Sequence, residues 1–132
     1  PCVVMDCTDN FEVRYAINKA CVDNSLPMVY GSVTGGEGQV AVFCPTKDNP
    51  NCPCFACKYP EMPRSLDKPP PVIPGICSFV ATIQAQQAIA LITGIGTILS
   101  GYMASVNLLD LKIKQYKLKD RNPECKVCGI SE

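Results

Sequence analysis

Two closely spaced cysteine pairs are the residues best suited to chemistry in this sequence. Cys54 and Cys57 form one pair, and Cys125 and Cys128 form the other, each with two residues between the thiols. Four thiolates in two such pairs fit a tetrahedral, all-sulfur structural zinc site. Because every coordination position would be filled, such a site has no place for a substrate or a water molecule. The spacing therefore predicts a structural zinc ion that fixes the C-terminal tail to an earlier segment of the chain.

Two other uses of these thiols stay open at this point, namely redox-active pairs and disulfides. A redox-active pair of the thioredoxin type would begin a helix, and neither pair obviously does so. Cys52, which precedes the first pair, is a spare thiol that could replace one of the ligands. The two-pair spacing favours zinc over both alternatives.

The composition narrows the possible chemistry further. Histidine is absent, which excludes histidine-based nucleophilic catalysis and histidine-bearing zinc sites. Acid–base work would fall to carboxylates, Lys, Tyr, thiols or the substrate itself. The formal net charge is +0, so we expect neither nucleic acid nor an anionic membrane surface as a partner. We also expect no signal peptide and no stretch long and apolar enough to span a bilayer.

The ten cysteines indicate a reducing compartment rather than a secreted disulfide framework. Cys7, Cys21 and Cys77 lie inside apolar runs, where a free thiol behaves as a small hydrophobe. We therefore expect a cytoplasmic protein. Its 132 residues, 47% of them hydrophobic, are enough for a single domain with a buried core.

Hydrophobic patterning in the first third of the chain indicates an α/β fold. The patterned segments are strands over 3–5, 28–30 and 39–43 and a helix over 11–22. Asp9 or Asn10 can cap that helix. The first strand, the helix and the second strand form one βαβ unit with parallel strands. A turn over 33–38 then leads to the third strand, which has antiparallel character.

The second half combines a long loop, a helix and a hairpin. Residues 44–75 hold most of the prolines and show no sustained periodicity, so we expect a long ordered loop or lid. Residues 77–93 are almost wholly apolar and predict a buried helix. Two final strands, over 103–109 and 112–119, should form a hairpin around Asp110. The sheet is therefore expected to be mixed, with antiparallel strands at its C-terminal end.

Several short motifs follow one another in an informative order. They are DCTDNF at 6–11 followed by Arg14 and Asn18, Gly31, EGQV at 37–40 leading into FCP at 43–45, Gln84-Ala85, Gly101, Asp110 and NPECKVCG at 122–129. With the two cysteine pairs, this order resembles the adenylyltransferases of the MoeB and ThiF type, relatives of the ubiquitin-activating enzymes. The resemblance covers essentially the whole chain. It implies the C-terminal part of a Rossmann-like, ubiquitin-activating-type fold.

The resemblance implies an enzyme that uses MgATP to convert a carboxylate, typically the C-terminal glycine of a ubiquitin-like sulfur-carrier protein, into an acyl-adenylate. Asp9 matches the family's magnesium-binding aspartate, and Asn10 and Arg14 are further candidates for contact with ATP or substrate. A carboxylate at the C-terminal end of a buried strand faces the crevice where α/β sheets bind ligands. Asp9 could instead serve only as a helix cap, and Arg14 could form an ion pair or pack on the sheet.

Two features of that family are missing from this sequence. There is no glycine-rich GxGxxG turn, and the basic residues that members place on the ATP phosphates are absent. We therefore expect residues 1–132 to be a single domain equivalent to the C-terminal half of the enzyme, inactive alone. The apolar strand over 3–5 would then need a partner, which could be the missing half, a second polypeptide or another copy.

Many members also carry a reactive cysteine in the loop before the long helix. No cysteine occurs between Lys58 and Ile76, so we assign no reactive thiol. Cys77 is the nearest thiol, and its apolar neighbours favour a packing role.

Three functions remain open from the sequence. The first is adenylation of a carrier protein's C-terminus, and the second is the same chemistry on a small-molecule carboxylic acid. The third is a non-catalytic, zinc-stapled docking or dimerisation module. Its contact surface would be the strands after Gly101 together with an apolar group that would otherwise be core: Val72, Ile73, Ile76 and Phe79. The resemblance also implies a homodimer.

Overall fold

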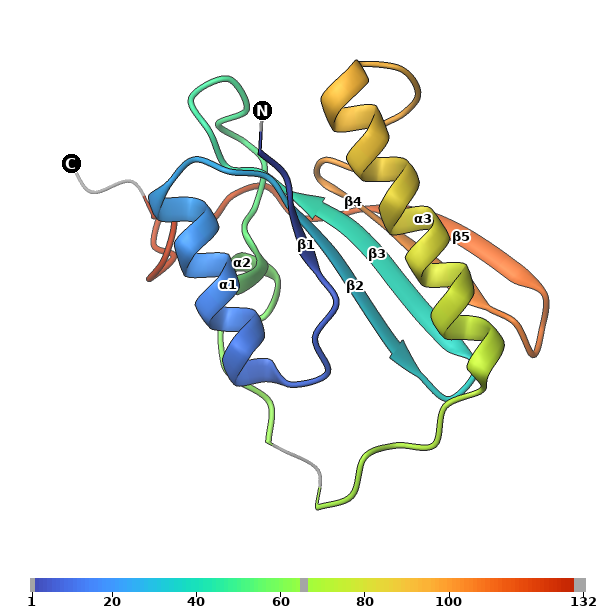
Figure 1. The fold of residues 1–132 in the computed structure, drawn as a ribbon. Helices are drawn as coiled ribbons and strands as arrows, with labels where there is room; N and C mark the ends of the chain where they lie inside the picture. The colour runs from blue at the N-terminus through green and yellow to red at the C-terminus, as the bar shows by residue number, and fades with distance from the viewer. Residues whose placement is uncertain (1, 65–66, 130–132) are drawn as a thin grey trace.

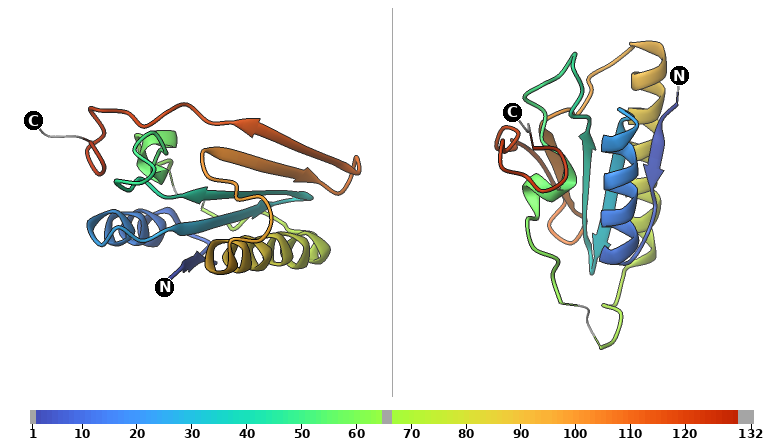
Figure 2. Two further views of the ribbon diagram at one scale, coloured as in Figure 1. Left: turned by 90° about the horizontal axis from the view of Figure 1, so that it is seen from above. Right: turned by 90° about the vertical axis from the view of Figure 1, so that its left-hand side faces the viewer.

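A mixed five-stranded sheet organises the part of the chain that the structure, a computed structural model, describes: residues 2–64 and 67–129. Across the sheet the strands are β1 (Val4–Asp6), β2 (Met28–Thr34), β3 (Glu37–Phe43), β4 (Tyr102–Asn107) and β5 (Lys112–Lys117) (Figure 1). β1 and β2 are parallel, and each later pair of neighbours is antiparallel. Seen from above, β1 and β5 lie at opposite edges (Figure 2). The predicted mixed sheet with antiparallel C-terminal strands is confirmed.

Helix α1 (Phe11–Asp23) connects the two parallel strands, as predicted. The Asn10 side chain accepts a hydrogen bond from the Val13 backbone N–H at 2.9 Å, so Asn10 is the cap. The buried residues of α1 are polar as well as apolar, since Arg14 and Asn18 lie on the same face as Cys21. This face turns two polar side chains toward the interior, where each needs a partner.

The turn between β2 and β3 is tighter than the predicted turn over 33–38. Both strands continue to either side of Gly35 and Gly36, which alone form the connection. Gly35 has φ of 60°, a left-handed conformation that glycine adopts without steric cost. Val33, Thr34 and Glu37 belong to the strands rather than to the turn, because Val33 pairs with Gly38 and Thr34 with Glu37 across the hairpin.

The segment over 44–75 contains more regular structure than the predicted loop. Helix α2 (Phe55–Lys58) lies within it, and α3 (Pro74–Thr93) begins before its end, because proline is well tolerated at the first helical positions. The segment is anchored on the β2–β3 turn: the Gly35 N–H donates to the Pro71 carbonyl at 2.9 Å. Residues 65 and 66, near its middle, lie outside the described residues.

Helix α3 is buried on one face only, which corrects the prediction of a buried helix. The buried residues are Ile76, Val80, Gln84, Gln87 and Ala90, and they face β2 and β3. The opposite face exposes Phe79, Ile89 and Ile92, with 36%, 52% and 56% of their surface accessible. An apolar sequence cannot report which of its faces is covered, because that depends on the elements packed against it.

By length and composition alone, α3 could also cross a bilayer, contrary to the expectation that no such stretch exists. It has 20 residues and no charged side chain. A core helix of a soluble protein meets the same two criteria. In this structure the Gln84 amide donates to the Asp6 carbonyl at 2.8 Å, so the helix is attached to the sheet through a polar side chain.

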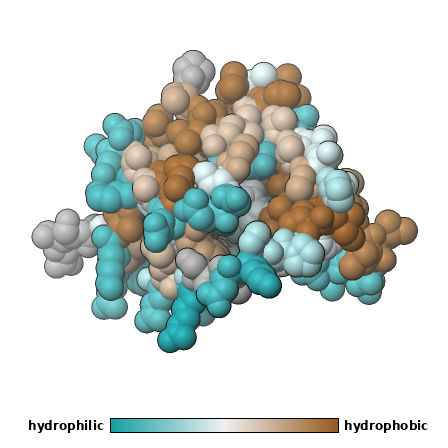
Figure 3. Space-filling model, turned by 60° about the horizontal axis from the view of Figure 1, so that its bottom comes forward, coloured by the Kyte–Doolittle hydropathy of each residue, from teal (hydrophilic) through white to brown (hydrophobic). Residues whose placement is uncertain are grey.

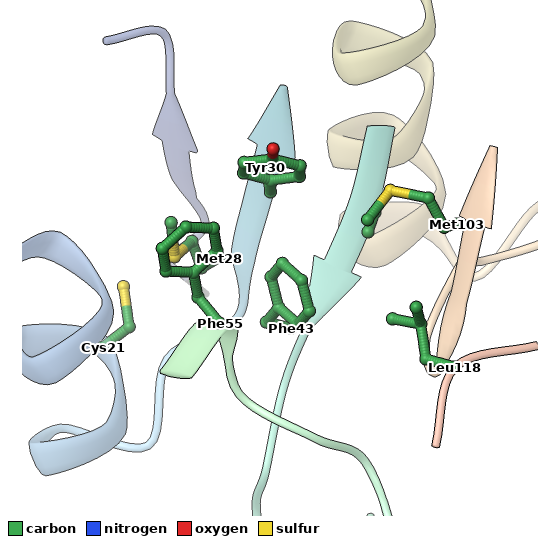
Figure 4. Packing of buried hydrophobic residues seen from close by; sticks show 8 residues of the cluster. Cys21, Met28, Tyr30, Phe43, Phe55, Met103 and Leu118 are labelled. Atoms are coloured by element: carbon green, nitrogen blue, oxygen red, sulfur yellow. The ribbon is translucent and has the colours of Figure 1, made fainter. Parts of the chain in front are cut away.

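The alternation of side chains along β2 divides the core into two clusters. Met28 and Tyr30 face α1 and α2, where they pack with Phe43 and Phe55 (Figure 4). Val29 points to the other side of the sheet, toward α3. Figure 1 accordingly shows α1 and α2 on one side of β2 and α3 on the other. Period-two alternation of a central strand places one helix layer on each face.

The C-terminal hairpin is present as predicted, with somewhat shorter strands. Asp110 lies in the connection, and Asn107 stabilises it by accepting a hydrogen bond from the Leu109 N–H at 2.9 Å. Every residue of β5, the edge strand opposite β1, is exposed. Lys112, Lys114 and Lys117 lie along this edge, and such charged side chains are typical of edge strands that resist pairing with other chains.

Candidate metal centre and ligand cavity

Four cysteine sulfurs lie together where the segment around α2 meets the C-terminal tail. The Sγ atoms of Cys54, Cys57, Cys125 and Cys128 all lie within 4.8 Å of one another. Three of the separations are 3.9 Å for Cys54–Cys57, 3.7 Å for Cys54–Cys125 and 3.3 Å for Cys57–Cys128. A tetrahedral site with metal–sulfur bonds of about 2.3 Å places its sulfurs about 3.8 Å apart. The cluster could therefore hold a metal ion, and the predicted convergence of the two pairs is confirmed.

A tight turn presents the second pair. The Gly129 N–H donates to the Cys125 carbonyl at 2.9 Å, and a Cβ on Gly129 would lie only 2.4 Å from that oxygen. Only glycine fits this position of the tight turn. The Arg121 Nε donates to the Cys128 carbonyl at 2.8 Å, which holds the tail from its other side. Glycine and arginine thus shape the backbone so that both sulfurs point to one place.

The first pair does begin a helix, which corrects the sequence argument against a redox-active pair. Cys54 is the N-cap of the four-residue α2, and Cys57 lies within it. The arrangement of the sulfurs supplies a better argument. Cys54 lies as close to Cys125 as to its own neighbour in the motif, so all four thiols form one cluster.

The close thiols change one another's pKa. A hydrogen bond from Cys54 is the main cause that lowers the pKa of Cys57, to about 4, and the same contact together with burial raises the pKa of Cys54. Burial is the main cause that raises the pKa of Cys128, to about 11. Negative charge is therefore favourable on the Cys57 sulfur and costly on those of Cys54 and Cys128. A metal cation would favour the thiolate form of all four.

The remaining thiols of the prediction lie outside this cluster. Cys52 is buried, and its Sγ accepts hydrogen bonds from the Cys44 N–H at 3.3 Å and the Ser100 hydroxyl at 3.4 Å. It is therefore not one of the four clustered ligands. Cys77 is exposed near the start of α3, so the predicted packing role is wrong. Cys7 is also exposed, whereas Cys21 packs in the core as predicted.

A cavity of about 650 Å³ lies between the start of α1, the ends of β2 and β3, and the long loop. Asp9 and Asn10 line it from the segment that follows β1, and Ser32 and Gln39 line it from the sheet. The long loop contributes three prolines, Pro63, Pro69 and Pro70. This is the carboxyl end of the two parallel strands, where α/β sheets bind ligands.

The surface around this cavity is divided by polarity. Figure 3 views this end of the molecule, with hydrophilic residues gathered on its left and lower parts. A hydrophobic area lies on the right, where Figure 1 places the β4–β5 connection and the start of α3. The exposed apolar residues of these two segments include Ile73, directly before α3, and Leu109 and Leu111, between β4 and β5. Val72, Ile73 and Phe79 are thus partly exposed, while Ile76 belongs to the core.

Arg14 is buried beside the cavity and forms an ion pair with Asp6. Its Nε donates to Asp6 Oδ2 at 2.8 Å, and its Nη2 donates to the carbonyls of Thr8 at 2.6 Å and Gly31 at 3.3 Å. The guanidinium also lies over the Tyr30 ring, 5.0 Å from its centre. The ion pair that the sequence left open is therefore present. Arg14 fixes the segment that follows β1 from its buried side.

Asp9, Asn10 and Arg14 therefore line one cavity, and the four cysteines form a separate cluster. The sequence motifs contain Asp6 and Asn18, but sequence reasoning gave neither residue a role. Asp6 ends β1 and is fully buried, which an acidic residue after an apolar run does not reveal. Asn18 lies four residues after Arg14, hence on the same face of α1, and that spacing could have indicated a buried polar face.

The fold and the two sites define a class: a Rossmann-like α/β domain with a ligand cavity at its parallel strands and a four-cysteine cluster that can hold a metal. Residues 1–127 match the ThiF family, and the chain belongs to this family. The resemblance to the MoeB and ThiF type that the motifs indicated is confirmed.

Curated relatives carry related names. The chain is 33% identical over 137 residues to the sulfur carrier protein adenylyltransferase of Thermus thermophilus, covering 96% of this chain and 48% of that protein. It is 31% identical over 131 residues to the adenylyltransferase and sulfurtransferase MOCS3 of Caenorhabditis briggsae, covering 96% and 32%. The chain thus spans about half or less of the length of these relatives.

Solved structures confirm the fold. The E. coli MccB structure with ATP superimposes with a TM-score of 0.75 at 18% identity, over 95% of this chain and 38% of that chain. A heterocyclase in complex with substrate and cofactor gives 0.71 at 16% identity, over 96% and 20%. At this level of identity, the likeness concerns the fold alone.

Proposed function

We propose that this chain is part of an ATP-dependent adenylyltransferase that activates the C-terminal glycine of a ubiquitin-like sulfur-carrier protein. The observation that carries the proposal is the cavity at the end of β1 and β2, where Asp9 presents an exposed carboxylate beneath a proline-rich loop. Membership of the ThiF family and the names of the curated relatives support the same activity.

The proposed reaction transfers the adenylyl group of ATP to the substrate carboxylate. A carboxylate oxygen attacks the α-phosphorus, the bond from that phosphorus to the bridging oxygen breaks, and pyrophosphate leaves with both electrons of that bond. Asp9 would hold Mg²⁺, which offsets the charge of the phosphates. A single exposed carboxylate suits Mg²⁺, since this ion usually takes only one or two protein carboxylates and keeps waters and phosphate oxygens.

The other residues that line the cavity would position Asp9 and the substrate. The Asn10 side-chain oxygen is committed to the N-terminus of α1, which leaves its amide N–H groups for ATP or substrate. Arg14 would hold the segment that follows β1 in place from its buried side, because its guanidinium is hydrogen-bonded to Asp6 and to two backbone carbonyls. Prolines on the loop side and the polar side chains of Ser32, Thr34 and Gln39 on the sheet side suit an extended polypeptide end without bulky side chains.

Zinc is the metal that we propose for the four-cysteine cluster. Four sulfur ligands favour zinc or iron–sulfur centres, and four separate thiols at tetrahedral spacing suit a single zinc ion. Its role would be mechanical, since no ligand position stays open. Structural zinc sites contribute on the order of 10 kcal/mol to folding.

Residues that bind the ATP phosphates would come from outside this chain. β1 supports this proposal, because among the described residues only β2 pairs with it and Met5 is 36% exposed. A further strand at that edge, from a missing half or a second polypeptide, would cover it. A homodimer and a cytoplasmic location are part of the same proposal, and the free thiols of the described chain suit a reducing compartment.

Pyrophosphate exchange tests the proposed activity. Radiolabelled pyrophosphate should enter ATP when the chain is combined with the nucleotide-binding half of a relative, Mg²⁺ and a carrier protein ending in Gly-Gly. Asp9→Ala should lower the exchange rate by about 100-fold or more, the scale of losing one preorganised electrostatic contact. Glu12→Ala, which removes another exposed carboxylate from the start of α1, is the matched control and should retain the activity.

The same assay separates the competing functions. Full exchange in Asp9→Ala would contradict the magnesium role. Exchange with a small carboxylic acid but not with the carrier protein would change the substrate class. Carrier binding without nucleotide dependence, and without exchange in any combination, would point instead to a docking module.

A further inference from the structure

Asn18 bridges helix α1 and the first cysteine pair. Its Nδ2 donates to Cys54 Sγ at 3.5 Å, and its Oδ1 accepts a hydrogen bond from the Phe55 N–H at 2.9 Å. The side chain is 1% exposed, so water cannot replace either bond. One amide group thus contacts both a candidate metal ligand and the backbone directly after it.

An N–H group directed at a metal-ligating thiolate has two physical effects. It stabilises the negative charge that remains on the sulfur, and it fixes the direction of the sulfur's lone pairs. Such outer contacts set the affinity of metal sites as well as their geometry. Asn18 is placed for both effects at Cys54, because its second bond holds the backbone of Phe55 at the same time.

Phe55, whose backbone Asn18 binds, connects this contact with the ligand cavity through aromatic packing. The ring of Phe55 lies 5.1 Å from the ring of Tyr15 on α1 and 5.0 Å from that of Tyr59. The Tyr15 hydroxyl donates to the Tyr59 carbonyl, and Tyr59 lines the cavity. A packed path therefore runs from Cys54 to the cavity wall, and α1 itself begins at that wall.

We propose that Asn18 is a positioning residue for the metal centre: it orients Cys54 and couples metal binding to the cavity wall at Tyr59. The proposal goes beyond adenylation, since it involves neither ATP nor a carboxylate. A purely structural role, in which Asn18 only anchors the Phe55 backbone, is the alternative that an experiment has to exclude.

Two substitutions separate these roles in the purified, zinc-loaded chain. Asn18→Asp keeps an oxygen for the Phe55 N–H but offers no N–H to Cys54 and brings a negative charge toward the sulfur. Asn18→Leu removes both bonds at similar volume. In competition with a chromogenic chelator, both variants should bind zinc with an apparent affinity about 10- to 100-fold lower than that of the parent. Lys19→Ala, on the exposed side of the same helix, is the control and should match the parent.

Cobalt substitution provides a readout that an anchoring role would not change. Cobalt(II) in a four-sulfur site has sulfur-to-metal charge-transfer absorption, which should shift in Asn18→Asp because the charge on Cys54 Sγ changes. If Asn18→Asp instead keeps the parent's zinc affinity and cobalt spectrum while Asn18→Leu loses zinc, Asn18 is an anchor only and the proposal is wrong.

Hydrogen exchange tests the coupling to the cavity. In the zinc-loaded chains, Asn18→Leu should speed amide exchange at Tyr59 and over 11–15 relative to the parent, while the β3 amides stay protected. Faster exchange confined to the cysteine segments, over 52–57 and 121–129, would overturn the coupling. Because no nucleotide or carrier protein is present, these results do not depend on whether the proposed adenylation is correct.

Discussion

Arg14 and Asp6 form a buried ion pair beside the ligand cavity, and of the two only Arg14 lines the cavity itself. The carboxylate is fully buried and the guanidinium nearly so, and they meet at 2.8 Å. Asp6 also accepts hydrogen bonds from the Thr8 backbone N–H at 3.0 Å and from its hydroxyl at 2.6 Å. The short segment that leads to Asp9 is therefore held at both its backbone and its side chains. Burial makes this arrangement sensitive to the loss of either partner.

Removing the guanidinium should destabilise the chain strongly. In Arg14→Met the Asp6 carboxylate stays buried without its ion pair, and we expect a loss of about 3–5 kcal/mol in the free energy of unfolding. Urea unfolding measures this loss. Lys19→Ala breaks an ion pair of similar length, 2.6 Å, but that pair is exposed and should be worth about 0.5 kcal/mol or less. Equal losses in the two variants would contradict the buried-pair interpretation.

The reactivity of each thiol should depend on how deeply the folded chain buries it, not on whether its neighbours in the sequence are apolar. Burial raises the pKa of Cys21 to about 11, so it carries little thiolate at pH 8 and is also shielded from reagents. Iodoacetamide at pH 8 should label Cys7 and Cys77 in the folded chain and spare Cys21 and Cys52 until the chain unfolds. Peptide mass mapping before and after denaturation checks this, and early labelling of Cys21 would contradict it.

Helix α3 and the sheet meet at an unusually close point. A Cβ added to Gly31 would lie 2.3–2.6 Å from the Gln84 side-chain amide, which itself donates to the Asp6 and Val29 carbonyls. The missing side chain of Gly31 therefore allows Gln84 to reach across from α3 to both parallel strands. This contact determines how the helix is attached, whereas the helix's outer face stays apolar and exposed.

Gly31→Ala should displace Gln84 and lower the free energy of unfolding by about 1–3 kcal/mol, the usual cost of overpacking. Gly75→Ala is the matched control, because a Cβ there meets only Leu108 at an ordinary 3.8 Å. Within α3, alanine at that position should be neutral or stabilising by up to about 1 kcal/mol. Thermal unfolding of both variants checks the pair, and a stable Gly31→Ala would mean that Gln84 does not need its observed position.

At the scale of the whole molecule, the cysteine cluster joins segments that are distant in the sequence. Cys125 and Cys128 belong to a tail with no strand or helix among its described residues, and they meet the segment around α2. The Arg121 N–H donates to the Asn51 carbonyl at 2.9 Å, one of few backbone links between the two segments. A metal ion bound by the four cysteines would therefore join the tail to the segment around α2.

The purified chain should contain one zinc ion per molecule by elemental analysis. Cys125→Ser should lower zinc occupancy, since only three thiolates remain, and should make residues beyond 118 accessible to limited proteolysis. Cys52→Ser removes a buried thiol next to the first pair but outside the cluster, so it should keep its zinc. Full zinc occupancy in Cys125→Ser would contradict the four-cysteine site.

The order of the secondary-structure elements and the four clustered cysteines could be predicted from the sequence, because the signals for them are local. The spacing of two cysteine pairs indicated which four thiols lie together, and apolar periodicity indicated the order of strands and helices. The tertiary structure alone decided that Arg14 pairs with Asp6, that Cys52 lies outside the cluster and that α3 leaves one face exposed. Each of these depends on which distant segments pack together, and burial of a side chain is a property of its neighbours in space, not of its neighbours in the chain.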